Sequence, residues 1–291
     1  MRAAIGIIGG SGLYQMEGVE DLQELRISTP FGEPSDALLI GKLDGIDVAF
    51  LPRHGRGHRV APHEINYRAN IWALKSVGVK WVLSVSAVGS MREDIHPGQL
   101  VVVDQFIDRT RTRPSTFFDN GVVAHVQVAD PVCPVLRKVL VDACGKLEHT
   151  FHDGGTYVCI EGPQFSTRAE SHLYRSWGAS VVGMTNLPEA RLAREAEIAY
   201  ATLAMATDYD CWHEGHDDVT VDAVIAVMRA NVAKAQKVLR HAVTGIQDAG
   251  PSLAWKALEF AIMTAPNQIP PAARERLALL IDHRLPAAAH A

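Results

Sequence analysis

Two polar clusters in the second half of the sequence carry residue types suited to chemistry. The first is residues 183–189, GMTNLPE, and the second ends the apolar run 198–206 with two carboxylates one residue apart, Asp208 and Asp210. Burial and a neighbouring carboxylate both raise the pKa of such a group, so one member of the pair can hold a proton and act as an acid. A solvated turn is the competing interpretation, because charged side chains usually face water.

A cationic loop earlier in the chain offers the opposite charge. Residues 52–59, PRHGRGHR, hold three arginines and two histidines with glycines between them. The glycines let the backbone approach a ligand, and the arginine fork fits the oxygens of a phosphate group. A solvated charged surface is the alternative interpretation of this run.

Small hydroxyl residues after other apolar runs add candidate donors to an anion. Ser11 lies in a glycine-rich turn, Ser86 follows the run 81–85, and Thr185 lies in the first polar cluster. An oxyanion is held best by several donors that converge from different loops. A plain turn is the alternative for the glycine-rich segment.

The hydrophobic pattern predicts one α/β domain, with a helical carboxyl-terminal tail, that positions these loops. We expect a helix at residues 189–197 to connect two parallel strands, so that both polar clusters lie at carboxyl ends of strands, where ligands bind in open α/β sheets. The sequence predicts strands at 3–8, 37–40, 46–51, 81–85, 100–103, 156–160, 181–182 and 198–206. It predicts helices at 65–77, 135–147, 189–197, 221–243, 253–263 and 273–283. Asp44-Gly45 predicts a hairpin turn, and Thr167 with Glu170 predicts a capping box.

Composition narrows the classes of function. The chain of 291 residues has a formal net charge of -5 and four cysteines, with no CxxC pair and no zinc-ligand spacing. This charge gives no general attraction to nucleic acid or to an anionic membrane, so a bound anion must be held locally. We expect a cytoplasmic protein with reduced thiols, since the sequence has no signal-peptide pattern and no apolar stretch of membrane length.

Several common catalytic motifs are missing from the sequence. It contains no GxxxxGK[ST] phosphate loop, no GxSxG nucleophile elbow and no HExxH metal motif. What remains is an anion pocket near an acidic pair, with Phe165 as a candidate for stacking on a base. Phosphate at one end and a nitrogenous base at the other describe the phosphorolysis of a nucleoside. A core position is the alternative for Phe165.

Seven separated motifs resemble the trimeric purine nucleoside phosphorylase family. In chain order they are IGIIGGSGL (5–13), TPFGEPSD (29–36), RHG (53–55), NYRAN (66–70), DQFIDRT (104–110), EGP (161–163) and TDYDCW (207–212). The resemblance runs from about residue 5 to residue 243 and is specific, because so many motifs occur in the same order. It implies a central mixed β-sheet flanked by helices over residues 1–245, and a helical extension over residues 246–291 on or near the active site.

The resemblance implies a role for each matching residue. The implied phosphate-binding residues are Ser11, Arg53, His54, Ser86, the amide of Ala87, and Thr185. The implied substrate-binding residues are Phe165 on the purine, Met184 at the ribose hydroxyls, and Val221, Val224, Ile225 and a neighbouring subunit's His125 around the methylthio group. Asp208 and Asp210 would be catalytic, one donating a proton to purine N7 and the other accepting from the 6-amino group. Gly183 and Asn186 depart from the Asn and Thr more common in animal relatives.

The implied activity is that of a pentosyltransferase. It would convert S-methyl-5'-thioadenosine and phosphate to adenine and 5-methylthioribose 1-phosphate, with phosphate as co-substrate and no further cofactor. The implied assembly is a homotrimer with active sites at the subunit interfaces. The open alternatives are a 6-oxopurine or methylthioinosine phosphorylase on the same fold, a nucleosidase that uses water, and a non-catalytic nucleoside-binding protein.

Overall fold

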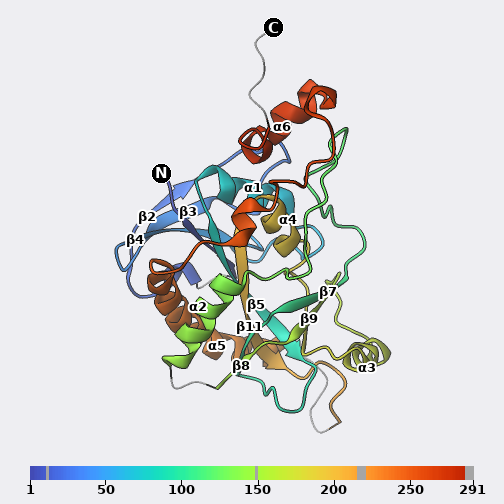
Figure 1. Ribbon diagram of the computed structural model, residues 1–291. Coiled ribbons are helices and arrows are strands. Elements are labelled where there is room, and N and C mark those ends of the chain that lie inside the picture. The colour runs from blue at the N-terminus through green and yellow to red at the C-terminus, as the bar shows by residue number, and fades with distance from the viewer. Residues whose placement is uncertain (11–12, 148–149, 215–220, 286–291) are drawn as a thin grey trace.

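The computed structural model describes residues 1–10, 13–147, 150–214 and 221–285, which form one mixed sheet with helices on both faces (Figure 1). The strands are β1 (Ile5–Gly9), β2 (Val19–Leu25), β3 (Leu38–Leu43), β4 (Ile46–Pro52), β5 (Trp81–Ser90), β6 (Leu100–Val102), β7 (Gln105–Arg109), β8 (Phe151–Asp153), β9 (Thr156–Ile160), β10 (Val181–Gly183) and β11 (Ala199–Asp208). The α-helices are α1 (Tyr67–Ser76), α2 (Pro134–Gly145), α3 (Arg168–Ser176), α4 (Glu189–Glu195), α5 (Val221–Ile246) and α6 (Pro271–Ile281). The predicted α/β fold with a mixed central sheet and flanking helices is confirmed.

Strand β5 is the point at which the sheet divides. It pairs in parallel with β1 and with β11, and its last two residues pair antiparallel with β10. One path of strands therefore runs β2-β3-β4-β1-β5-β10-β9-β7, while β11, β6 and β8 leave β5 in another direction. The segments that follow β10 and β11 contribute residues to the candidate site described below.

The prediction that residues 181–182 and 198–206 form strands of the same sense is wrong. Strand β10 runs antiparallel to β5, whereas β11 runs parallel to it. Both strands nevertheless end beside Gly89, which pairs with Val182 on one side and with Asp208 on the other. A Cβ atom on Gly89 would lie 2.9 Å from Asp208 Oδ1 and 3.2 Å from Val182 Cγ1. The two polar clusters thus approach each other across β5 rather than along an open edge.

The local predictions based on turn and cap chemistry are confirmed. Strands β3 and β4 form an antiparallel hairpin whose turn residues, Asp44 and Gly45, have φ values of 50° and 81°. Thr167 and Glu170 form a reciprocal capping box at the start of α3. These features depend on residues that are neighbours in sequence, and so the sequence alone specifies them.

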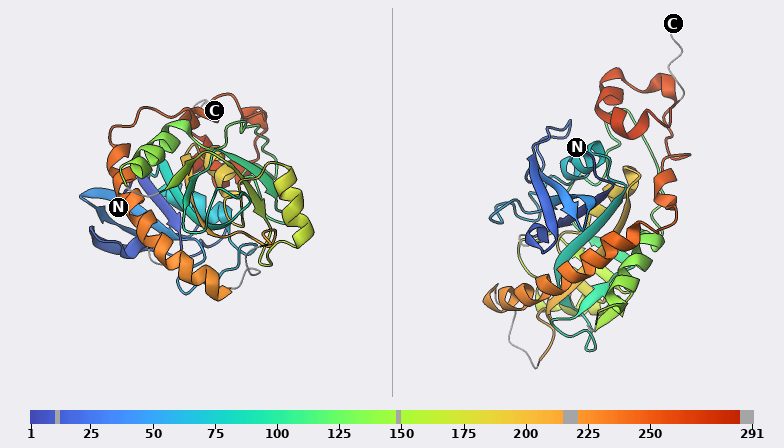
Figure 2. Two further views of the ribbon diagram at one scale, coloured as in Figure 1. Left: turned by 90° about the horizontal axis from the view of Figure 1, so that it is seen from below. Right: turned by 90° about the vertical axis from the view of Figure 1, so that its left-hand side faces the viewer.

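Two apolar clusters fill the space between the sheet and its helices. Alternate residues of the central strands face opposite sides, as strand geometry requires: Val82 and Tyr200 join the cluster that contains α1 and α4, whereas Leu83 and Ala201 join the cluster that contains α2 and α5. The two helical layers are visible on either side of the sheet (Figure 2). Along the described part of the chain, none of the helices has the length and apolar character needed to cross a membrane.

The carboxyl-terminal segment packs at the amino ends of β5 and β11, far along β11 from Asp208 (Figure 1). The indole of Trp255 donates to Lys80 O and packs edge-on against Trp81, with ring centroids 4.8 Å apart. Glu197 holds the segment in place through its buried carboxylate. The carboxylate accepts from the Leu258 amide at 3.0 Å and from the His283 ring at 2.6 Å, and it forms an ion pair with Arg284.

The predicted helix at residues 253–263 is wrong, whereas that at 273–283 corresponds to α6. Only a 3-10 turn, η2 (Leu253–Lys256), forms in the first stretch, and a second 3-10 turn, η3 (Pro266–Gln268), precedes α6. The backbone of residues 261–263 instead bonds to residues 123–125, since His125 N donates to Ala261 O and Met263 N donates to Val123 O. These long-range backbone bonds outweigh the helical periodicity of the segment.

Candidate active site

A fully buried ion pair forms the centre of the candidate site. Arg53, which directly follows β4, is 2% exposed, and Glu189, the first residue of α4, is 0% exposed. The guanidinium donates to both carboxylate oxygens, from Nε at 2.8 Å and from Nη2 at 2.9 Å, and Nη1 donates to Val85 O at 2.9 Å. Although burial alone would lower it, the Glu189 carboxylate raises the pKa of Arg53, so the cation stays charged.

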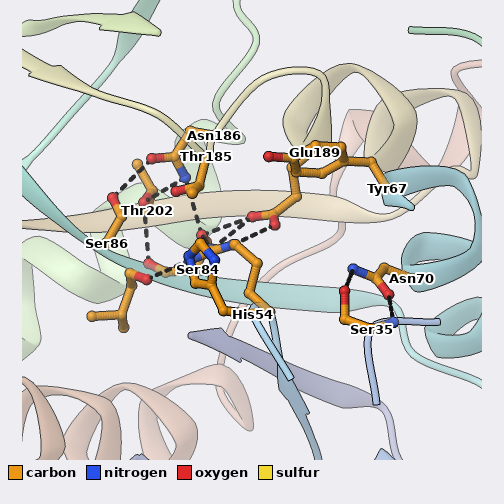
Figure 3. A network of polar contacts seen from close by, with 12 residues as sticks. Ser35, His54, Tyr67, Asn70, Ser84, Ser86, Thr185, Asn186, Glu189 and Thr202 are labelled. Carbon is orange, nitrogen blue, oxygen red and sulfur yellow. Dashed lines mark hydrogen bonds and ion pairs between the residues drawn. The ribbon is translucent and has the colours of Figure 1, made fainter. Parts of the chain in front are cut away.

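Asn186 connects this ion pair to the hydroxyl groups at the end of β5. Its Oδ1 accepts from Ser86 Oγ at 2.9 Å, and its Nδ2 lies 3.0 Å from Ser84 Oγ (Figure 3). The same Nδ2 lies 2.5 Å from the hydroxyl of Tyr200. The hydroxyls of Ser84 and Tyr200 in turn donate to Glu189 Oε1, at 2.9 and 2.8 Å. Ser86 and Arg53 are therefore held by one continuous polar network.

Thr185 differs from the other hydroxyl residues because its side chain has no partner among the residues that the structure describes. Its Oγ1 is buried and makes no hydrogen bond to any residue that the structure describes. A buried hydroxyl without a partner is unfavourable unless a ligand supplies one.

The backbone just before Thr185 is tightly packed, since a Cβ atom on Gly183 would lie 2.1 Å from the Tyr157 hydroxyl. The glycine at position 183 is thus required by the buried tyrosine.

His54 contributes a neutral ring beside Arg53. Its Nδ1 lies 2.9 Å from Val60 O, and its ring stacks on that of His58 with centroids 4.2 Å apart. Burial, followed by the positive charge of Arg53, lowers the pKa of His54 to about 4. A carbonyl oxygen can only accept, so Nδ1 carries the proton and Nε2 is left as an acceptor in the neutral ring.

The acidic pair lies at the end of β11. Asp208 accepts from Thr207 Oγ1 at 2.6 Å and from the Asp210 amide at 2.7 Å, so both of its oxygens are bonded. Asp210 Oδ2, in contrast, is buried without a partner in the described ranges. Burial raises the pKa of both carboxyl groups, and the charge of Asp208 raises that of Asp210 further. The geometry separates a bonded carboxylate from one that is open to a ligand.

The loop after β9, which carries Phe165, contacts the segment that follows the acidic pair. Phe165 is 49% exposed, so its alternative interpretation as a core residue is wrong. The loop contacts the segment after Asp210, because Cys211 Sγ lies 3.4 Å from Ser166 O. Met184 approaches from the loop after β10, where a Cβ atom on Gly162 would lie 2.6 Å from Met184 Sδ.

Some of the expected site residues lie away from this group or outside the description. Ser11 lies outside the described residues, as do the side chains of Val221, Val224 and Ile225 in the first turns of α5. Ala87 is half-buried on β5, and His125 is exposed. In the ranges that the structure describes, no three or more His, Cys, Asp or Glu side chains are grouped so that they could hold a metal ion.

Sequence reasoning missed the residues that orient the others. Glu189 belongs to the first polar cluster and starts a predicted helix, but the sequence assigns it no role in the site, and it singles out neither Tyr200 nor Arg113, although all three are buried. The local sequence gives little signal, because the apolar surroundings of Tyr200 and the polar segment around Arg113 do not distinguish a buried polar side chain from an exposed one. Arg113 bonds to both loops next to the site and is described further below.

Comparison with known proteins places this site in a family. Residues 4–244 match the family model of the phosphorylase superfamily. The chain belongs to the phosphorylase superfamily. Within this superfamily it is 58% identical to the S-methyl-5'-thioadenosine phosphorylase of Geobacter sulfurreducens, over 97% of this chain and 99% of the relative. The enzyme of the same name from Thermosynechococcus vestitus is 57% identical, with the same coverage.

Solved structures of phosphorylase superfamily members agree with the fold. A methylthioadenosine phosphorylase from an antarctic soil metagenomic library matches with a TM-score of 0.93 at 50% identity, covering 98% of this chain and 99% of that one. The methylthioadenosine phosphorylase of Schistosoma mansoni in complex with adenine matches with a TM-score of 0.81 at 34% identity, covering 97% and 98%. The family expected from the seven sequence motifs is thereby confirmed.

Proposed function

We propose that this member of the phosphorylase superfamily catalyses phosphorolysis of S-methyl-5'-thioadenosine, which yields adenine and 5-methylthioribose 1-phosphate. Relatives that bear the corresponding name match nearly the whole chain. The observation that carries the proposal is a pair of buried oxygens without partners in the described residues, Thr185 Oγ1 after β10 and Asp210 Oδ2 after β11. One is suited to a phosphate oxygen and the other to a purine nitrogen.

The phosphate would be held on the side of the buried ion pair. The proposed set comprises Ser11, Arg53, His54, Ser86, the Ala87 amide and Thr185. Within it, His54 Nε2 would accept from a protonated oxygen of the phosphate, because Nδ1 carries the ring proton. The network through Asn186 supports this assignment, because it fixes Ser86 and Arg53 before any ligand arrives. Side chains that are already in position stabilise an anion effectively, and here the hydroxyl hydrogen of Ser86, which is donated to Asn186, would turn to the phosphate. Phosphate is the co-substrate in this proposal, which includes no further cofactor.

The base would be held by the acidic pair. We assign the proton donor to Asp210, since its Oδ2 is open and its pKa is raised by burial and then by Asp208. As the glycosidic bond breaks, its electron pair moves to the purine, and Asp210 protonates N7 of the leaving base. A phosphate oxygen then bonds to the anomeric carbon of the oxocarbenium-like ribosyl group. Asp208 would accept from the 6-amino group, with Phe165 packed on the purine and Met184 at the ribose.

The proposed assembly is a homotrimer in which one subunit completes its neighbour's site. Large apolar side chains are exposed beside the backbone contact between residues 123–125 and 261–263: Val123 is 50% exposed, Phe260 91% and Met263 64%. An exposed apolar surface of this kind is typical of an interface. We assign a second copy of this chain to it, with His125 from this surface reaching the neighbour's methylthio pocket near Val221, Val224 and Ile225. Light scattering that gives the mass of one chain would contradict this assembly.

The division into residues 1–245 and a carboxyl-terminal extension, 246–291, is also part of the proposal. Within one chain, the extension lies at the amino ends of β5 and β11, whereas Asp208 lies at the other end of β11. Because Phe260 and Met263 share a surface with His125, the extension would approach the neighbouring subunit's active site rather than its own. A cytoplasmic location is proposed for this nucleoside-degrading activity.

The deciding experiment follows the release of free base from methylthioadenosine, adenosine and methylthioinosine, each with and without phosphate. The proposal expects adenine from methylthioadenosine only when phosphate is present. Release without phosphate would indicate a nucleosidase, and faster release from methylthioinosine would indicate a 6-oxopurine enzyme. Binding of the nucleoside without release of base would indicate a non-catalytic binding protein.

A further inference from the structure

Arg113 bridges two loops that flank the candidate site. It comes from the long segment between β7 and α2 (Figure 1), and its side chain is only 1% exposed. Its Nη1 donates to Met184 O and Leu187 O, both at 2.7 Å. Its Nη2 donates to Glu161 O at 2.5 Å and to Ile160 O at 3.3 Å. A single guanidinium therefore joins the loop after β10 to the loop after β9.

A third element also contributes to the surroundings of Arg113. Its Nη1 lies 2.9 Å from the hydroxyl of Tyr67 on α1, and that hydroxyl donates to Pro62 O at 3.0 Å. The carboxylate of Glu161 stays 3.8 Å from Nε. Removing a cation from water costs several kcal/mol, and here this cost is offset mainly by carbonyl dipoles from both loops. The charge is tolerated only while the two loops keep their spacing.

These loops carry residues on both sides of the proposed reaction. Four residues beyond Glu161 lies Phe165, the proposed purine contact, and the other loop carries Met184 and Thr185, the proposed ribose and phosphate contacts. The loops touch where Gly162 faces Met184 Sδ. We propose that Arg113 is a positioning residue that fixes the distance between these loops and thereby the fit of the nucleoside beside the phosphate. This inference rests on the proposed function.

The test compares Arg113→Lys with Arg111→Lys, a matched change at an exposed arginine of the same segment. Lysine keeps the charge but is a compact point charge that cannot span both sets of carbonyls. We expect kcat/KM for methylthioadenosine to fall roughly 10- to 100-fold in Arg113→Lys, as displacements of about 1 Å commonly cause. The fall should combine a higher KM for the nucleoside with a lower kcat, whereas Arg111→Lys should stay within about twofold of wild type. A lower unfolding temperature with unchanged KM and kcat per folded enzyme would overturn the proposal.

A second variant, Tyr67→Phe, decides the matter if Arg113→Lys does not fold. It removes one acceptor of Arg113 and leaves the guanidinium in place, so the same rise in KM and fall in kcat are expected on a smaller scale. Unchanged constants would overturn the proposal. If the wild-type enzyme released no adenine, the proposed function would be contradicted, but the positioning role of Arg113 would not. Calorimetric binding of methylthioadenosine would then replace kinetics, with weaker binding expected in Tyr67→Phe and equal binding overturning the role of Arg113.

Discussion

The phosphate side and the base side of the candidate site differ in how completely their polar groups are paired. On the phosphate side, Arg53 is bonded to both oxygens of Glu189, and Asn186 ties Ser86 into the same network. On the base side, the Asp210 carboxyl keeps one oxygen without a partner in the described residues. One side is fixed in advance, and the other is left open.

The difference suits two different chemical tasks. A network whose charges and donors are already oriented stabilises an anion without reorganising during the reaction. A buried carboxyl with a raised pKa and an open oxygen can instead give and take a proton. Variants that exchange these properties, by opening the paired side or blocking the open one, would test whether the two sides divide the work in this way.

The largest expected effect comes from blocking the open side with Asp210→Asn. The amide cannot donate the proton that leaves with the purine, so kcat for methylthioadenosine should fall by about 10²- to 10⁴-fold. The unfolding temperature at neutral pH should stay the same or rise slightly, because Oδ2 has no partner to lose among the described residues and the variant no longer buries a carboxylate whose pKa is raised. The matched control is Asp94→Asn, which changes an exposed carboxylate. If Asp210→Asn kept the kcat of the wild type, Asp210 would not be the proton donor.

Opening the paired side with Glu189→Ala should have the next largest effect, on stability. The change leaves a buried guanidinium without its carboxylate, which typically costs about 3–5 kcal/mol. Calorimetric or denaturant unfolding measures this difference. Asp47→Ala serves as the control because it breaks an exposed pair with Lys42, worth at most about 1 kcal/mol. Equal losses in the two variants would show that the buried network is not what stabilises this side.

The two sides should respond to pH in opposite directions. The lowered pKa of His54, about 4 against an ordinary 6.5, means that the folded state binds fewer protons there. Its stabilising contribution is present above pH 6.5 and is lost as the pH falls toward 4. The raised pKa of Asp210 changes the stability with pH in the opposite direction, because the folded state binds more protons there than the unfolded state. Its contribution is present below pH 3.8 and is lost as the pH rises through the raised value.

Unfolding free energies measured across this pH range would separate the two contributions. His54→Gln should remove a loss on the order of 2 kcal/mol on the acid side. Asp210→Asn should remove the decline in unfolding free energy as the pH rises, and it should leave unchanged the loss that His54 causes at acid pH. If both variants gave curves parallel to that of wild type, neither group would titrate differently in the folded and unfolded states.

The smallest expected effect is that of Thr185→Val. This variant tests the one hydroxyl proposed for the phosphate side that the described residues leave without a hydrogen bond. That hydroxyl has no partner within the described part of the chain, so the unfolding temperature should stay the same or rise slightly. The KM for phosphate should rise by roughly tenfold, the equivalent of one lost hydrogen bond. A fall in stability with an unchanged KM for phosphate would assign this hydroxyl to the fold rather than to the ligand.

The sequence predicts the fold best where the determinants are local. The hairpin at Asp44-Gly45, the capping box of α3 and strand β9 all follow from residues that are close together in the chain. The sense of β10 could not be predicted, because its antiparallel pairing with the last residues of β5 is a tertiary choice. The same is true of residues 261–263, whose backbone partners lie more than a hundred residues earlier.

The candidate site was predicted only in part, for a related reason. Hydroxyl and carboxylate side chains after apolar runs drew attention to Thr185 and Asp210. Glu189 lies in the first polar cluster, but its role as the partner of Arg53, 136 positions away, becomes recognisable only in the folded chain. Arg113 is similar, because its partners are mostly backbone carbonyls, which any sequence provides.

The contacts between Glu197 and the carboxyl-terminal segment have a consequence for shortened forms of the chain. The Glu197 carboxylate lies just before β11, yet its partners Leu258, His283 and Arg284 come 61, 86 and 87 residues later in the chain. A nascent chain that ends before them would leave this carboxylate unpaired at the edge of its core, which is strongly unfavourable. Truncation before residue 258 would therefore be expected to destabilise the centre of the molecule and expose the chain to proteolysis, rather than to leave a smaller enzyme.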